Sequence, residues 1–383
     1  MKIKLIIIVA IAMSLMACEN QENEFDDFGS TSVYFPFQTP VRTIIQGKYD
    51  LGFNENDNNS RFEIGVIMSG VYENGTNRSV SFELAPELID PAALVGVDNV
   101  NVKILPASYY TIEQESPVTI PAGSTKGRIP VQLTDAFFDD PLSFVTENDS
   151  VNYVIPLRIT GYEGLDSLLT GVPAVDNPIK IKADDWVTLP KDYTLFGIKF
   201  INKYDGIYLR RGEDKIAGTS EKFTVATGET EVTVIDTSTV YRQDFVTQDE
   251  LTPVLTAGRN KTVYSNLIRR ADIPSSGSVS LELTFDDNEE ITITNADEES
   301  DVDITGTGRF VENADEWGGE SRDAIYLEYQ YQDVAIEEEY LLGIILLSRT
   351  TLELTHTVND TLVIRDRDVK FEEFTVDLTL PLP

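Results

Sequence analysis

Two residue types that often perform nucleophilic or acid–base chemistry occur only once each in the 383-residue chain, as Cys18 and His356. His356 lies in LELTHTVND and alternates with Leu354 and Val358 on one face of an expected strand. A histidine in this pattern is more often a surface or packed residue than a base. A serine triad would need it, and the chain has no Gly-x-Ser-x-Gly motif. A zinc site of His and Cys is excluded by the count.

Carboxylates are abundant, with 65 Asp and Glu residues, so glycoside hydrolysis by a pair of acids is compatible with the composition. However, no spaced acidic motif follows a strand in the way that endo-acting glycosidases show. The chain also has no phosphate-binding glycine loop of the Walker or Rossmann type. We therefore expect no enzyme, no catalytic residue and no cofactor.

The segment DDNEEITITNADEESDVDITG is rich in oxygen ligands of the kind that calcium prefers. Its acidic residues are Asp286, Asp287, Glu289, Glu290, Asp297, Glu298, Glu299, Asp301 and Asp303. The spacing of an EF-hand is absent, and an acidic run is usually a solvated turn. We expect no metal site, and whether 286–303 binds calcium stays open.

Two tryptophans are the candidates for stacking against the apolar face of a sugar ring. Trp317 lies in ENADEWGGESRD, a polar segment between two strand patterns that indicates a loop, where function concentrates. It either contacts a glycan or folds back as a lid. Trp186, in ADDWVTLP, fits better as a packing residue at a domain junction.

The first residues, MKIKLIIIVAIAMSLMAC, have the layout of a secretory signal peptide over residues 1–17. Lys2 and Lys4 precede an apolar run that is too short to span a membrane, which needs about 20 residues. Leu15–Met16–Ala17–Cys18 resembles the lipobox of bacterial lipoproteins, which implies acylation of Cys18 and an acyl-chain anchor. The alternative is an ordinary signal peptide with a chance cysteine. No second cysteine exists for an internal disulfide.

An acidic tether follows over residues 18–31 and includes Glu19, Glu22, Glu24, Asp26 and Asp27. It resembles the export signal of Bacteroidetes lipoproteins, which directs them to the outer face of the outer membrane. The alternative is a plain solvated spacer.

The formal charge of the chain is −35. Removal of Lys2 and Lys4 with the signal peptide gives −35 − 2 = −37 for the mature chain. So acidic a surface repels phosphate backbones and anionic lipid, which argues against nucleic-acid partners and against electrostatic docking on a membrane.

Beyond residue 30 the hydrophobic pattern has a period of two residues, bounded by Gly, Asn, Asp and Pro. In SVSLELTF, for example, Val279, Leu281, Leu283 and Phe285 share one face. DDNEE and Asn359–Asp360 are interpreted as hairpin turns. The fold class is therefore predicted to be all-β.

Turn residues between 176 and 192 indicate a domain boundary. Residues 32–182 have the strand spacing of a β-sandwich. Residues 189–383 contain consecutive hairpins, which remove their exposed edges most simply by closing into an antiparallel barrel.

A series of motifs in the first domain, including LTDAFF and YVIPLRIT, resembles a domain of unknown function in Bacteroidetes surface lipoproteins. The same type precedes some endo-β-N-acetylglucosaminidase domains, and the resemblance implies an immunoglobulin-like sandwich. YTLFGIKFINKYDGIYLRRG, GTGRFVENADEWGGESRDAIYLEYQY and TVNDTLVIRDR resemble its usual partner, which implies a lipocalin-like barrel beginning at Gly206–Ile207–Tyr208.

The resemblance implies a cell-surface, non-catalytic glycan-binding role in polysaccharide uptake, with a glycan ligand and an outer-membrane transporter complex as expected partners. The alternatives are a scaffold that docks a transporter or glycosidase, and a carbohydrate-active enzyme with an unfamiliar acid pair. Ser150, Ser167 and Thr361 resemble the short acceptor motif for O-glycosylation in exported Bacteroidetes proteins.

Overall fold

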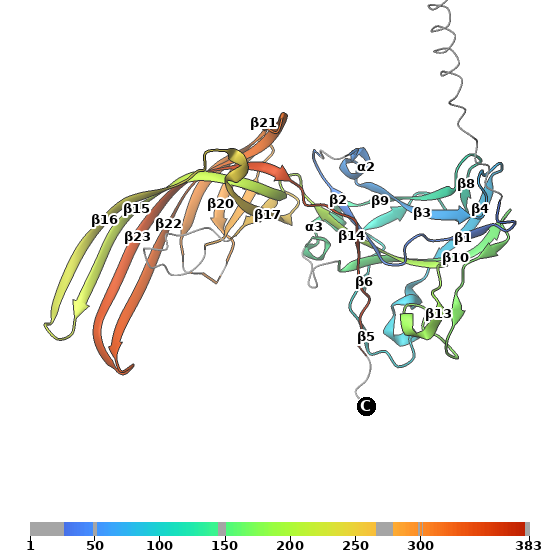
Figure 1. The fold of residues 1–383 in the computed structure, drawn as a ribbon, viewed down its shortest axis with the longest axis horizontal. Helices are drawn as coiled ribbons and strands as arrows, with labels where there is room; N and C mark the ends of the chain where they lie inside the picture. The colour runs from blue at the N-terminus through green and yellow to red at the C-terminus, as the bar shows by residue number, and fades with distance from the viewer. Residues whose placement is uncertain are drawn as a thin grey trace, which may run out of the picture.

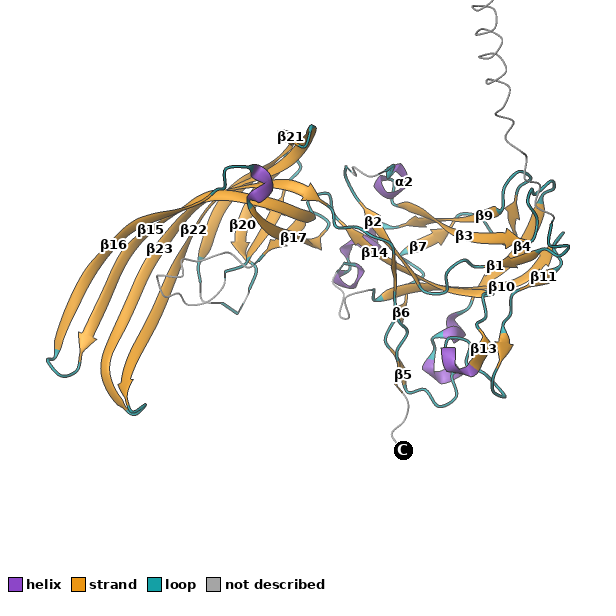
Figure 2. Ribbon diagram, in the orientation of Figure 1, coloured by secondary structure: helices purple, strands orange, loops and turns teal. Residues whose placement is uncertain are grey.

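The computed structural model describes residues 27–48, 52–144, 151–265, 279–297, 299–300 and 302–379. Strands dominate and the helices are short (Figure 2). Two β units lie side by side along the long axis, joined by chain segments that pass between them (Figure 1). The prediction of an all-β fold is confirmed.

The first unit is a sandwich of two sheets. One sheet has the order β11-β1-β3-β9-β7, formed by Ser167–Leu168, Ser32–Tyr34, Arg61–Ser69, Lys126–Leu133 and Tyr110–Ile112. The other has the order β24-β2-β14-β10-β4-β8, formed by Glu372–Glu373, Pro40–Ile45, Tyr193–Ile201, Tyr153–Glu163, Arg78–Leu84 and Val118–Ile120. In addition, β6 (Lys103–Ile104) pairs with β10.

Alternating residues of these strands fill the space between the sheets, as the period of two requires. In β9, Ile129, Val131 and Leu133 are buried while their neighbours are more exposed. Helix α3 (Asp135–Asp139) adds Phe137 and Phe138 to the same core. The other α-helix among the described residues, α2 (Glu55–Asn58), lies between β2 and β3.

A second apolar layer covers the outer face of the β14 sheet. It is formed by residues of η1 (Pro86–Leu88) and β5 (Asn99–Val100), together with the end of the chain. Between η1 and β5 lies η2 (Pro91–Ala93), which has no buried residue. There β25 (Leu378–Thr379) pairs with β5, and Phe374 is buried. The chain therefore returns to the first unit after it has completed the second.

The first unit also contains four short elements. They are η3 (Pro141–Ser143), β12 (Val172–Pro173), η4 (Ala183–Asp185) and β13 (Trp186–Thr188), and β12 pairs with β13 in a separate two-stranded sheet.

The second unit is one nine-stranded sheet in the order β16-β15-β17-β18-β19-β20-β21-β22-β23. Because β23 also pairs with β15, all of these strands except β16 form a closed ring around an apolar interior. The strands are β15 (Gly206–Thr224), β16 (Glu229–Tyr241), β17 (Glu250–Gly258), β18 (Lys261–Tyr264), β19 (Leu281–Phe285), β20 (Glu290–Asn295), β21 (Ile304–Trp317), β22 (Glu320–Leu341) and β23 (Ile345–Asp366). The short η5 (Val246–Gln248) precedes β17.

Four strands continue well beyond this ring (Figure 1). They are β16, residues 212–224 of β15, residues 345–357 of β23 and residues 332–341 of β22, and we call them the extension. Within it β16 pairs with β15, β15 with β23 and β23 with β22. Ile216, Leu352, Leu354 and Ala335 form its own small apolar cluster.

Two details differ from the sequence predictions. Tyr193–Ile201 was expected in the second domain, which was placed at 189–383, but it is β14, between β10 and β2 of the sandwich. Asn359–Asp360 was interpreted as a hairpin turn, which is wrong, because β23 runs through both residues as one continuous strand. Asp360 is buried in the barrel, where its carboxylate accepts hydrogen bonds that a turn in solvent would not offer. The hairpin at Phe285–Ile291 is confirmed.

Candidate functional site between the two units

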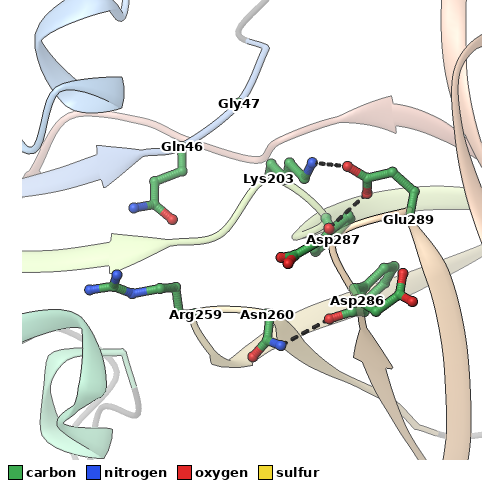
Figure 3. A pocket seen from close by; sticks show the side chains of 10 residues that line it. Gln46, Gly47, Lys203, Arg259, Asn260, Asp286, Asp287 and Glu289 are labelled. Atoms are coloured by element: carbon green, nitrogen blue, oxygen red, sulfur yellow. Dashed lines mark hydrogen bonds and ion pairs between the residues drawn. The ribbon is translucent and has the colours of Figure 1, made fainter. Parts of the chain in front are cut away.

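A pocket of about 490 Å³ lies where the first unit meets the near end of the barrel. Gln46 and Gly47 line it from the segment after β2 of the first unit (Figure 3). The remaining lining residues belong to the second unit or to the link that leads into it: Lys203, Tyr204, Arg259, Asn260, Phe285, Asp286, Asp287 and Glu289. A ligand in this pocket would contact both units.

Asn202 holds the linking segment in place beside the barrel. Its amide nitrogen donates to the carbonyl oxygens of Gly258 at 2.9 Å and Lys261 at 2.8 Å. Its side-chain oxygen accepts from the backbone N–H groups of Tyr204 at 3.0 Å and Asp205 at 3.1 Å. This fully buried amide satisfies polar groups that the turn from β14 into β15 would otherwise leave unpaired.

The inner wall of the pocket is an aromatic stack with one polar edge. The ring of Tyr204 lies parallel to that of Phe285, with centroids 3.4 Å apart, and edge-on to Phe310. Its hydroxyl donates to Glu289 Oε2 at 2.8 Å, and Lys203 forms an ion pair with Glu289. Burial and the Glu289 carboxylate raise the pKa of Tyr204, so this hydroxyl remains a donor.

The acidic edge of the pocket is the turn between β19 and β20. Asp286 Oδ1 accepts from the backbone N–H groups of Asn288 at 2.8 Å and Glu290 at 2.9 Å, which lowers the pKa of Asp286. Asp287 is exposed beside it. The side-chain oxygens of both residues can accept hydrogen bonds from a ligand's hydroxyl groups.

The cation on the opposite side of the pocket, Arg259, joins the barrel to the first unit. Its guanidinium donates to the carbonyl oxygen of Asp135 at 3.2 Å and to its carboxylate at 2.9 Å, and it lies 5.2 Å from the ring centroid of Phe138. In Figure 3 it points away from Asp287 and Glu289. The pocket thus combines amide, carboxylate and cationic groups on a scaffold that is fixed from both sides.

A buried ion pair occupies the opposite part of the barrel interior. Arg210, which is 2 % exposed, donates through Nε to both Asp360 oxygens at 3.2 Å and through Nη2 at 3.1 Å. The hydroxyl groups of Tyr329 and Tyr264 also donate to Asp360, at 3.0 and 3.3 Å. Burial, and then the Asp360 carboxylate, raise the pKa of both tyrosines.

Sequence reasoning missed this cluster because Asp360 follows an asparagine, a pair that is common in turns. The available signal was that Asp360 alternates with Val358 and Leu362, both buried. His356 continues the same face as a packed residue: its Nδ1 lies 2.8 Å from Asp214, and its ring stacks on Tyr331.

The two tryptophans do not line the pocket. Trp317 is the last residue of β21, next to a tight Gly318–Gly319 turn rather than in a long loop. Its indole N–H donates to the Ile364 carbonyl oxygen at 3.4 Å, and the Arg322 guanidinium lies 4.4 Å from its ring centroid. It is half-buried on the barrel.

Trp186 belongs to the first unit, where it begins β13. Its indole N–H donates to the carbonyl oxygen of Ile179 at 3.0 Å, and the Lys180 ammonium lies 5.6 Å from its ring centroid. It is a packing residue within that unit, with one face against a cation.

The remaining candidate residues are scattered. Ser167 is half-buried in β11, where its hydroxyl lies 2.8 Å from that of Ser32, and Thr361 is half-buried in β23. Cys18, Ser150, Glu298 and Asp301 lie outside the described residues, as do the signal peptide and most of the acidic tether.

Two features are absent from the part of the chain that the structure describes. The described residues contain no group of three or more His, Cys, Asp or Glu side chains arranged to hold a metal ion. Nor do they contain a helix that combines the length and the apolar character needed to cross a membrane.

Comparisons with known proteins agree with the two-unit architecture. Residues 203–368 match the family model described as a domain of unknown function, DUF5627. Residues 26–166 match a family model described as an N-terminal domain. No curated protein matches the chain.

Among solved structures, a Bacteroides ovatus protein of unknown function is 28% identical, with a TM-score of 0.71, and the match covers 93% of this chain and 100% of that one. A second B. ovatus protein of unknown function is 12% identical over 91% of this chain and 99% of that one, with a TM-score of 0.38. An auxiliary nutrient binding protein from Bacteroides thetaiotaomicron is 14% identical over 87% of this chain and 95% of that one, with a TM-score of 0.34.

The chain is thus similar over most of its length to a Bacteroides protein of unknown function, and it contains a region that matches a domain of unknown function. The expected resemblance to Bacteroidetes proteins built from such domains is confirmed at this level.

Proposed function

We propose that the protein is a non-catalytic, glycan-binding lipoprotein, anchored through Cys18 on the outer face of the outer membrane, within a polysaccharide-uptake system. The pocket between the two units is the observation that supports it most directly. Its polar groups, Gln46, Asn260, Asp286 and Asp287, suit a ligand with many hydroxyl groups, since each can accept or donate hydrogen bonds.

The ligand test uses the mature chain with Cys18→Ser, which removes the acyl anchor. Affinity electrophoresis and calorimetry against a broad glycan panel should find at least one ligand. Gln46→Ala, from the first unit, and Asp287→Ala, from the second, should each weaken binding roughly three- to tenfold, the value of one hydrogen bond.

Glu290→Ala is the matched control, because Glu290 is an exposed acid in the same turn that does not line the pocket. Trp317→Ala tests a competing site on the barrel surface. If this variant loses binding while the pocket variants bind normally, the ligand binds at Trp317 and not in the pocket. Uniform absence of binding would reject the glycan-binding role, and release of reducing sugar would reject its non-catalytic character.

A second candidate function is a scaffold that docks a transporter or glycosidase. It is favoured by the extension, whose hairpin tip carries Leu342 and Ile344 at 85 % and 79 % exposure. Exposed apolar groups gathered at one tip are typical of protein contact surfaces. Pull-down from solubilised outer membranes with the intact chain and with Leu342→Ser/Ile344→Ser should separate the two functions, because a scaffold loses its transporter or glycosidase in the variant.

A further inference from the structure

The outer edge of the extension is a long strand that lacks several of the features that keep sheet edges from pairing. β16 runs for 13 residues from Glu229 to Tyr241, and no described strand pairs with the side that faces away from β15. Proteins usually protect such an edge with a lysine, a proline, a bulge or a short length. ETEVTVIDTSTVY contains no lysine, proline or glycine, and its pairing with β15 has no register shift.

The opposite edge of the same extension provides the contrast. There β22 carries three consecutive acids, Glu337, Glu338 and Glu339, and its register shifts at Glu339/Tyr340. Charge and a bulge are two of the usual protections. The β16 edge also carries acids, Glu229, Glu231 and Asp236, but they are not consecutive and its register is regular. It exposes Val232, Val234 and Val240 at 56, 76 and 63 %.

We propose that β16 pairs with β16 of a second copy of this chain, antiparallel, around a two-fold axis at Ile235. Two-fold symmetry requires a self-complementary surface. In an antiparallel pair, directly opposed residues point to the same face of the sheet, whereas neighbours along one strand point to opposite faces. The two-fold axis must therefore lie between one residue and its own copy. Only an axis at Ile235 pairs all of 229–241, since it sets Glu229 opposite Tyr241.

The charges of β16 agree with this register. An axis at Ile235 places Glu231 opposite Thr239 and Asp236 opposite Val234, so that no two acids face each other. An axis one residue later places Asp236 opposite its own copy, and like charges directly opposite are destabilising. An axis one residue earlier leaves Val240 and Tyr241 without partners in the strand.

The size of the contact suits a specific dimer. At about 3.4 Å per residue the paired strands span roughly 44 Å, and their ladder adds about a dozen main-chain hydrogen bonds, against about ten in a typical interface. Ile235, which packs partly against the apolar cluster of the extension, meets its own copy at the axis. The mature charge of −37 opposes association, so dimers should tighten as salt rises.

The first test is sedimentation equilibrium of the mature Cys18→Ser chain over a range of concentrations and salt. We expect a monomer–dimer equilibrium that shifts to dimer with added salt. Val234→Lys places a cation opposite each Asp236 and should tighten the dimer, while Val234→Glu should weaken it, each roughly tenfold over the two pairs. Lys and Glu at Ile336, which lies on the β22 edge and is 52 % exposed against 76 % for Val234, should change nothing.

The second test uses the absence of other cysteines. In the Cys18→Ser chain, Ile235→Cys should form a disulfide-linked dimer under mild oxidation, because opposed residues lie about 4.5–5.5 Å apart between Cα atoms, within disulfide range. Ile336→Cys should not. A monomer under every condition, the same effect of both Val234 variants, or equal cross-linking at Ile336 would each overturn the proposal.

Discussion

The buried ion pair in the barrel gives a quantitative prediction about stability. Asp360 is 2 % exposed and Arg210 is equally buried, and Asp360 accepts hydrogen bonds from the guanidinium and from two tyrosines. Asp360→Leu leaves two buried hydroxyls without their acceptor, and it leaves the buried guanidinium with the Glu250 carboxylate at 3.5 Å. Loss of one partner of such a pair costs about 3–5 kcal/mol of unfolding free energy, whereas replacing both partners with apolar residues costs far less.

We therefore expect Asp360→Leu and Arg210→Met each to lower the urea midpoint of the barrel by roughly 1–2 M, at a slope of about 2–3 kcal/mol per M. The double variant should be less destabilised than the sum of the two by at least about 2 kcal/mol. Trp317 fluorescence in a Trp186→Phe background reports the barrel alone, because the chain has only two tryptophans. Additive effects of the two substitutions would refute the coupling that this geometry requires.

Two further predictions concern the first unit, with Trp186 as its fluorescent reporter. Burial raises the pKa of Tyr193 to about 12, so the stability it contributes is complete below about pH 10 and is lost as pH rises towards 12. The unfolding free energy of the first unit should therefore fall by about 2 kcal/mol over this range, and Tyr193→Phe should remove most of that fall. An unchanged pH profile in the variant would contradict this. Phe374→Ala should destabilise the first unit by about 3–5 kcal/mol while the Trp317 signal of the barrel stays unchanged. Phe371→Ala, at an exposed position nearby, is the control, and an equal loss there would show that burial is not the cause.

Strand patterns were predictable because their signal is local. In β19 and β20 the alternation of Leu281, Leu283 and Phe285 with polar residues requires one buried face, and DDNEE supplies the turn between them. The start of β15 at Gly206 was also predictable, because a glycine before a strand pattern marks a position where the chain turns or approaches another segment closely. A Cβ at Gly206 would lie 2.8 Å from the carbonyl oxygen of Asp366, so only glycine allows that approach.

The candidate pocket was not predictable, because its parts come from segments far apart in the chain. Gln46, Lys203, Arg259 and Asp287 belong to four different turns, and no spacing in the sequence relates them. The ion pair was missed for another reason. Turn propensity is a local preference, and the buried guanidinium of Arg210, 150 residues away from Asp360, overrides it.

The path of the chain explains why a pocket between the units can hold a fixed shape. The chain crosses from β14 into β15 through Asn202, and it crosses back after β23 to place β24 against β2. Lys199 pairs with Glu372 at 2.8 Å where the outgoing and returning segments meet. Arg259 adds a third connection through Asp135. A hinge needs a single flexible link, whereas these connections act at separate points, so the lining groups from the two units keep fixed relative positions.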